Sequence, residues 1–297
     1  MPSSNAPFPN HPSQDPHAGI TSASTVGPAS NDNPSADIRL DQYYTRPDVA
    51  AALYRVCREH FHPSMFRMVE PSAGDGSFFR LLPPGSLGFD LMPRYPGIRK
   101  ADFLSTTLPA DRPLAVVGNP PFGRNASMAV RFFNQAASQA SVIAFVMPRS
   151  VRKASVENRL DRSFHLLREV DVPRDAFVFR GRPFHVPAVF QIWVRLGTPR
   201  QLRRVETTHP DFEFTTPDVA DFAIQRVGAR AGRIHYDFAR SPSAHYFIRG
   251  GVGLVAMIGQ LDFATAAADV AGNPSLSKAE IVSLYEALLA KRAGCRA

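Results

Sequence analysis

The chain has 297 residues, of which 44% are hydrophobic, and a formal net charge of +8 at pH 7. That length allows one large domain or a domain with an appendage, and the basic charge favours an anionic partner such as nucleic acid. No apolar run approaches the ~18 residues of a membrane-spanning helix, no secretory signal is visible, and two cysteines indicate neither a disulfide framework nor a metal site. We therefore expect a cytoplasmic monomer without a metal or a membrane partner.

The N-terminal residues 1–38 are rich in Pro, Ser, Asn and Ala and have few large apolar side chains. Such a segment buries too little surface to offset its ordering entropy, so it is predicted to be disordered. A helix is then expected from about Pro47, with Thr45 as its N-cap, because apolar residues such as Val49 and Leu53 recur at helical spacing.

A short apolar strand ending at Glu70 leads into a loop with glycines at 74 and 76, and a helix is expected from about Ser77. Glycines let the backbone pass close to a ligand and adopt positive φ. The loop is not Gly-x-Gly-x-x-Gly and no lysine follows it, so neither a dinucleotide nor a nucleoside triphosphate is favoured. Asp90 ends the next strand, 20 residues after Glu70, where an acid can accept both hydroxyl hydrogens of a ribose.

The apolar run Leu114–Val117 is read as a buried strand that ends in Asn119-Pro120-Pro121-Phe122. Two successive prolines fix φ and stiffen the turn. The Asn119 side-chain oxygen and the Pro120 carbonyl could each accept one hydrogen of an exocyclic amino group, while Phe122 stacks on its ring. This arrangement predicts a site for a planar aromatic amine.

The tetrapeptide at 119–122 resembles the catalytic motif of S-adenosylmethionine-dependent amino-methyltransferases that act on adenine N6. Residues 70–78 resemble motif I of these enzymes, and residues 41–47 resemble their motif X, in the same order along the chain. The resemblance covers roughly residues 41–196 and implies S-adenosyl-L-methionine as the cofactor. The residues that it implies for cofactor binding are Tyr44, Thr45, Glu70, Pro71, Ala73, Gly74, Gly76, Asp90, Asp102 and Phe103. The implied catalytic residues are Asn119, Pro120, Pro121 and Phe122.

The segment 175–185 reads as a basic, aromatic loop. The resemblance places there a second aromatic residue that clamps the target base, and Phe184 is favoured over Phe179. Arg180 and Arg182 would then approach phosphate, as basic residues interleaved with aromatic ones often do. The alternative is that either phenylalanine belongs to the core.

Strands alternating with helices predict an α/β fold with an open, mainly parallel sheet. The resemblance implies a Rossmann-like class I methyltransferase whose last strand is antiparallel. The predicted organisation is a disordered tail over 1–38, a catalytic domain over 39–198 and a small C-terminal appendage over 199–297. The arginines of the appendage make it a candidate nucleic-acid contact, with a solvated charged surface as the alternative. A capping box at Ser277 and Glu280 predicts a packing helix there.

The predicted function is methyl transfer from S-adenosylmethionine to the N6 amino group of adenine in DNA. Accepting both amino hydrogens at Asn119 and Pro120 frees the nitrogen lone pair, so no strong general base is needed. The alternatives are an adenine N6 methyltransferase acting on RNA and a protein glutamine methyltransferase, which uses a related tetrapeptide usually ending in Tyr. A non-enzymatic nucleic-acid-binding module is a further alternative from a different class.

Overall fold

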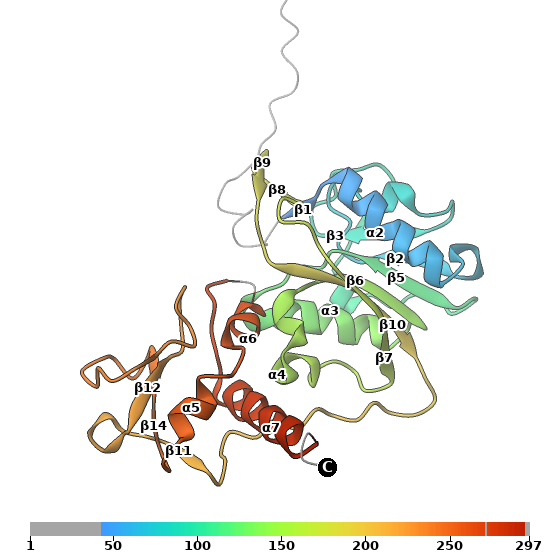
Figure 1. Ribbon diagram of the computed structural model, residues 1–297. Coiled ribbons are helices and arrows are strands. Elements are labelled where there is room, and N and C mark those ends of the chain that lie inside the picture. The colour runs from blue at the N-terminus through green and yellow to red at the C-terminus, as the bar shows by residue number, and fades with distance from the viewer. Residues whose placement is uncertain (1–42, 271, 295–297) are drawn as a thin grey trace, which may run out of the picture.

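A seven-stranded sheet forms the centre of the computed structural model, which describes residues 43–270 and 272–294 (Figure 1). The predicted disordered tail, residues 1–38, lies outside the described residues. The spatial order of the sheet is β4-β3-β2-β5-β6-β10-β7. Its strands are β2 (Arg67–Glu70), β3 (Leu87–Asp90), β4 (Ile98–Lys100), β5 (Leu114–Gly118), β6 (Val142–Pro148), β7 (Phe164–Asp171) and β10 (Ala188–Arg195).

The strand directions confirm the predicted α/β fold with a mainly parallel sheet. Strands β4, β3, β2, β5 and β6 run parallel to their neighbours, whereas β10 is antiparallel to both β6 and β7. The order reverses between β2 and β5, since β3 and β4 continue on one side and β6 on the other. Such a switch point leaves a crevice at the carboxyl ends of the two central strands, where ligands of open α/β sheets bind.

Helices cover both faces of the sheet, as a parallel sheet requires. Helix α3 (Ser127–Ala137) packs on the face that carries Val116 of β5, and helix α2 (Pro47–His60) packs on the opposite face, which carries Val117. All five residues of β5 are buried, so the strand runs through the core and surfaces only where it ends. A short helix, α4 (Ala154–Glu157), follows β6.

The prediction of a helix from Ser77 is wrong. The chain makes only one 3₁₀ turn, Phe79–Leu81, before Leu82 becomes extended with ψ 152°. The physical reason follows in the sequence, because Pro83 and Pro84 disfavour the helical conformation at the residue before them and remove two N–H donors. A single turn, rather than a helix, therefore follows the glycine loop.

The segment expected as a basic loop forms a β-hairpin instead, with strands β8 (Phe177–Phe179) and β9 (Arg182–Phe184). Arg180 and Gly181 connect them with φ of 51° and 73°, the positive pair that a two-residue type I′ hairpin needs. Strand β1 (Tyr44–Thr45) pairs with β8, so a separate three-stranded sheet joins the start of the described chain to the hairpin.

Helix α2 begins at Pro47 as expected, but the predicted N-cap is wrong. The N-cap position is occupied by Arg46, which makes no side-chain capping bond. Thr45 lies one residue too early and belongs to β1, where its hydroxyl accepts a hydrogen bond from Asn119 instead.

The C-terminal part has its own sheet and its own apolar cluster. The sheet order is β11-β14-β12-β13, and helices α6 and α7 lie between this sheet and the large one in Figure 1. Its elements are β11 (Phe212–Thr215), β12 (Phe222–Gln225), β13 (Ile234–His235), β14 (His245–Gly250), α5 (Leu254–Ile258), α6 (Phe263–Ala268) and α7 (Lys278–Gly294). The division of the chain between residues 198 and 199 stays a prediction. No helix among the described residues is long and apolar enough to cross a membrane.

The predicted capping box of α7 is confirmed. Ser277 donates its backbone N–H to Glu280 Oε2 at 2.8 Å, and Glu280 donates its own N–H to Ser277 Oγ at 3.3 Å. The same glutamate pairs with Lys153, which follows β6, at 2.9 Å, and Arg152 pairs with Asp269 at 3.3 Å. These ion pairs, formed by mostly buried side chains, join the C-terminal part to the large sheet.

Candidate functional site

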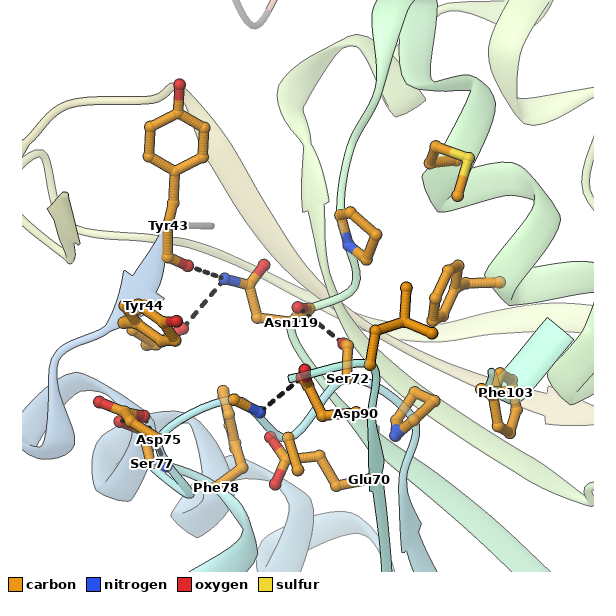
Figure 2. Close-up of a pocket in the computed structure, with 18 of the residues that line it drawn as sticks. Tyr43, Tyr44, Glu70, Ser72, Asp75, Ser77, Phe78, Asp90, Phe103 and Asn119 are labelled. Carbon is orange, nitrogen blue, oxygen red and sulfur yellow. Dashed lines mark hydrogen bonds between the residues drawn. The ribbon is translucent and has the colours of Figure 1, made fainter. Parts of the chain in front are cut away.

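A cavity of about 350 Å³ lies at the carboxyl ends of β2, β3 and β5 (Figure 2). Every residue predicted to bind the cofactor lines it except Gly76, which lies directly beside the lining residues Asp75 and Ser77. The predicted residues on its wall are Tyr44, Thr45, Glu70, Pro71, Ala73, Gly74, Asp90, Asp102 and Phe103. The switch point of the sheet therefore collects residues from four separate stretches of the sequence.

Aromatic rings pack against the two glycines of the loop after β2. Gly74 has φ of +48°, and a Cβ there would lie 2.7 Å from the ring of Tyr44. Gly76 has φ of +81°, and a Cβ there would lie 2.6 Å from the ring of Tyr95. Both glycines are needed for their backbone conformation and for the close approach of a ring, so the loop is bound to β1 through Tyr44.

Two acids sit at the ends of neighbouring strands and face the cavity. Asp90 Oδ2 accepts from the backbone N–H of Gly74 at 2.8 Å, and its Oδ1 accepts from that of Met92 at 2.7 Å. Asp102 Oδ1 accepts from the N–H of Leu104 at 2.9 Å. A carboxylate oxygen has two acceptor positions, so these bonds fix both acids while leaving capacity for a ligand's hydroxyl or amino hydrogens.

Glu70 ends β2 with a buried carboxyl group, and its side chain is 2% exposed. Its Oε2 has no hydrogen-bond partner among the described residues. Burial raises the pKa of Glu70 well above its ordinary value, and the nearby carboxylates of Asp75 and Asp90 raise it further. A buried acid without a cation is destabilised when it ionises, so this position suits a positively charged group of a ligand.

The side chain of Asn119 is held in one orientation at the rim of the cavity. Its Nδ2 donates to the backbone carbonyl of Tyr43 and to Thr45 Oγ1, both at 3.1 Å. A carbonyl only accepts, so the nitrogen, and not Oδ1, must point toward β1. Oδ1 is buried and has no hydrogen-bond partner among the described residues. Figure 2 shows the amide reaching β1, while the Asn119 backbone carbonyl accepts from Ser72 Oγ at 3.0 Å.

A second, smaller cavity of about 20 Å³ adjoins the first. Asn119, Pro121 and Tyr43 line both cavities, which therefore adjoin at these three residues. The predicted catalytic residues Pro120 and Phe122 line only the smaller one, together with Phe177 and Val186. Phe122 is half-buried and meets the edge of Phe177, with ring centroids 6.5 Å apart.

The turn after Phe122 is strained. Asn125 and Ala126 have φ of 52° and 59°, although neither is a glycine. Left-handed conformations of such residues cost on the order of 1–3 kcal/mol each and cluster near functional sites. The backbone carbonyl of Phe122 accepts from the N–H groups of Met128 and Ala129 at 3.1 and 3.2 Å, which ties this turn to the start of α3.

The predicted substrate-binding residues gather around Tyr43, and none of them lines either cavity. The Tyr43 ring lies 4.9 Å from Phe184 at an interplanar angle of 19°, and 5.2 Å from Phe179. The Arg180 guanidinium lies 5.1 Å from the Phe179 ring, and Arg182 is exposed on β9. The hairpin thus reaches the site through Tyr43, whose own backbone carbonyl positions Asn119.

Sequence reasoning assigned no role to several residues that line the larger cavity. They are Tyr43, Ser72, Asp75, Ser77, Phe78, Leu91, Ala101, Leu104, Met128, Arg131 and Phe132. Tyr43 and Ser72 were adjacent to predicted residues, but their contacts with Asn119 depend on the fold. Phe132 of α3 belongs to the apolar core and also borders the cavity, a position that depends on how α3 packs on the sheet.

No protein-family model matches the chain, and no curated protein matches it. Solved structures do match, each over a little more than half of the chain. A protein of Pyrococcus horikoshii, provisionally assigned as an RNA methyltransferase, is 13% identical over 54% of this chain and 90% of its own, with a TM-score of 0.40. The modification subunit of a provisionally assigned type I restriction enzyme from Vibrio vulnificus is 13% identical over 55% of this chain and 46% of its own, with a TM-score of 0.36. Magnesium protoporphyrin IX methyltransferase from Synechocystis, solved with bound S-adenosylmethionine, is 14% identical over 57% of this chain and 87% of its own, with a TM-score of 0.37.

We expect Gly74→Ala to weaken binding of S-adenosylhomocysteine at least about tenfold, as measured by isothermal titration calorimetry. The added Cβ would collide with the Tyr44 ring and push β1 away from the loop. Gly85→Ala is the matched control, because Gly85 has φ of +84° but nothing within 4 Å of an added Cβ. If Gly74→Ala bound S-adenosylhomocysteine as tightly as the unaltered protein does, the packing of Tyr44 on the loop would not be required for binding.

Proposed function

We propose that this protein transfers a methyl group from S-adenosylmethionine to the N6 amino group of adenine in DNA. The observation that carries the proposal is the buried, unpartnered Oδ1 of Asn119, a residue that lines both cavities. A buried acceptor without a donor costs about 1–3 kcal/mol, which an incoming amino group would recover. The stiff backbone at Pro120 presents a second carbonyl to the same amino group.

The larger cavity fits the cofactor in size and in chemistry. Its volume of about 350 Å³ is within the range of small-molecule sites. Glu70 would hold the cationic amino group of the methionine end, Asp90 the ribose hydroxyls, and Asp102 the amino group of the cofactor's adenine. S-adenosylmethionine supplies an electrophilic methyl group on a sulfonium when it is bound. The protein's contribution is then to orient this methyl group toward the smaller cavity.

Asn119 and Pro120 act on the target amine. Each accepts one amino hydrogen, which draws the nitrogen toward sp³ geometry and frees a lone pair that is otherwise delocalised into the ring. The new N–C bond forms as the C–S bond breaks, and one amino hydrogen leaves to solvent as a proton. Phe122, on the wall of the smaller cavity, supplies a face for the base. An adenine in duplex DNA must leave the stack to reach this position, and aromatic stacking offsets part of that cost.

The hairpin β8–β9 supplies the aromatic surface for the displaced base. Phe184 and Phe179 contact Tyr43, which lines both cavities, so a base that enters beside Phe122 meets this aromatic group next. Arg180 and Arg182 sit at the end of the hairpin and would face the phosphates on either side of the target nucleotide.

We expect labelled S-adenosylmethionine to label adenine N6 in DNA when the protein is offered separate DNA, RNA and protein pools. Asn119→Ala should lower the turnover number by about 10²–10³, because one of two charge-stabilising acceptors is lost, and should leave binding of S-adenosylhomocysteine unchanged by calorimetry. Label in RNA or protein alone would reject DNA as the substrate. Undiminished turnover of Asn119→Ala would reject the assigned mechanism.

Thr45→Val should lower the turnover number about tenfold with little change in the KM for S-adenosylmethionine, because Asn119 Nδ2 loses one of its two acceptors and the amide can rotate. Valine keeps the shape of threonine, and Thr45→Ser, which keeps the hydroxyl, is the matched control that should retain activity. If Thr45→Val changed only the KM, Thr45 would be a cofactor ligand and not a positioning residue.

Binding of S-adenosylhomocysteine should release a proton at a pH above the ordinary titration of a glutamate and below the titration of the ligand's own amino group. The pKa of Glu70 is raised in the free protein, and a docked ammonium lowers it, so the bound state holds fewer protons and affinity rises with pH across this window. Calorimetry in buffers of different ionisation enthalpy measures the released proton. Glu70→Gln should bind more weakly and abolish the release. Affinity that is independent of pH in the unaltered protein would refute this role of Glu70.

A further inference from the structure

The two faces of the sheet of the C-terminal part differ in what packs on them. On one face, Phe222, Ile224 and Ile248 pack into the apolar cluster with α5, α6 and α7. Side chains alternate along a strand, so Gln225 of β12 points to the opposite face. Gln225 lies directly across from His245 of β14. Helices α5, α6 and α7 pack on this first face, whereas on the second face Ala223 and Phe247 are also buried and only its end, at Gln225 and His245, is polar.

A hollow of about 580 Å³ lies at this polar end of the second face, where it is lined by Gln225 and His245. Its wall contains three guanidinium groups, two imidazoles and one carboxylate. The lining residues are Gln225, Ala229, Arg230, Arg233, His235, Asp237, Arg240 and His245. Arg240 pairs with Asp237 at 2.7 Å, whereas neither Arg230 nor Arg233 has an ion-pair partner within residues 43–270 and 272–294. The hollow therefore carries an uncompensated positive charge at neutral pH.

The turn that carries the two unpaired arginines is held rigidly. The Arg233 N–H donates to the Arg230 carbonyl at 3.0 Å, and the Gly232 N–H donates to the Gln225 carbonyl at 2.7 Å. Gly232 has φ of +96° and packs directly against Phe263 of α6, where any side chain would collide. Arg230 and Arg233 are thus presented side by side from a turn that is anchored in the apolar cluster.

The hollow also contains an unsatisfied polar atom. His235 Nδ1 accepts from the backbone N–H of Asp237 at 3.2 Å, which leaves the hydrogen of the neutral ring on Nε2. Nε2 is buried and has no hydrogen-bond partner among the described residues. Burial and the adjacent His245 lower the pKa of His235, which favours this neutral form.

We propose that this hollow binds a backbone phosphate of the DNA substrate, away from the methyl-transfer site. The inference rests on the proposed function, because it takes DNA as the substrate. The planar guanidinium group of arginine presents its N–H donors as a fork, which can bind two oxygens of a phosphodiester at once. The phosphate contact would position the duplex and read no sequence.

The test is the double variant Arg230→Gln/Arg233→Gln, titrated with a fluorescent DNA duplex at several salt concentrations. Both side chains are exposed, so the fold should be kept, and circular dichroism checks this. We expect affinity to fall about tenfold at low salt, and the slope of log K against log salt to shrink by about 1 to 2. Arg204→Gln/Arg292→Gln is the matched control, because it removes the same charge from exposed arginines outside the hollow.

Equal losses in the two double variants would overturn the inference, since general attraction would then explain the effect. So would an unchanged salt slope in Arg230→Gln/Arg233→Gln. The turnover number at saturating DNA distinguishes the phosphate site from the proposed methyl transfer, because Arg230→Gln/Arg233→Gln should keep the turnover number of the unaltered protein. If the unaltered protein methylates DNA and the double variant binds DNA normally, only this inference fails. If the unaltered protein methylates no DNA and does not bind the duplex, both fail.

Discussion

The structure of the site depends on how one amide is held. The Asn119 side-chain nitrogen donates both of its hydrogens, one to the main-chain carbonyl of Tyr43, just before β1, and one to the hydroxyl of Thr45 in β1. The oxygen of the same amide is thereby turned away from β1, and it is buried without a partner among the described residues in a residue that lines both cavities. The cost of an unsatisfied buried acceptor is retained in the free protein and is recovered when a donor arrives.

This arrangement brings together parts of the chain that are distant in the sequence. The switch point of the sheet places the end of β2 beside the end of β5, and so the glycine loop beside the tetrapeptide. Strand β1 adds a third component, because it pairs with β8 and also packs on Gly74 through Tyr44. The cavity and the hairpin are therefore linked through a strand of two residues.

The sequence predicted the fold class and the cavity wall well, because both depend on local patterns. Apolar runs ending in Glu70, Asp90 and Asn119 mark buried strands whose polar ends must emerge at one edge. The helix prediction after the glycine loop failed because Pro83 disfavours the helical conformation of the residue before it, so the chain makes only one turn. The link between Thr45 and Asn119 was not predictable, because it joins residues 74 positions apart. The hairpin was missed because Arg180 adopts positive φ, which that residue type rarely does.

The hydrogen bond from Asn119 to the Tyr43 carbonyl limits how the segment between Tyr43 and α2 can vary. A main-chain carbonyl is the same in every amino acid, so this contact imposes no demand on the side chain at position 43. It does demand that the number of residues between that carbonyl and α2 stays constant, since a deletion or insertion would carry the carbonyl out of register with β5. The segment is therefore constrained in length as well as at Tyr44 and Thr45, whereas connections at a protein surface usually tolerate insertions and deletions.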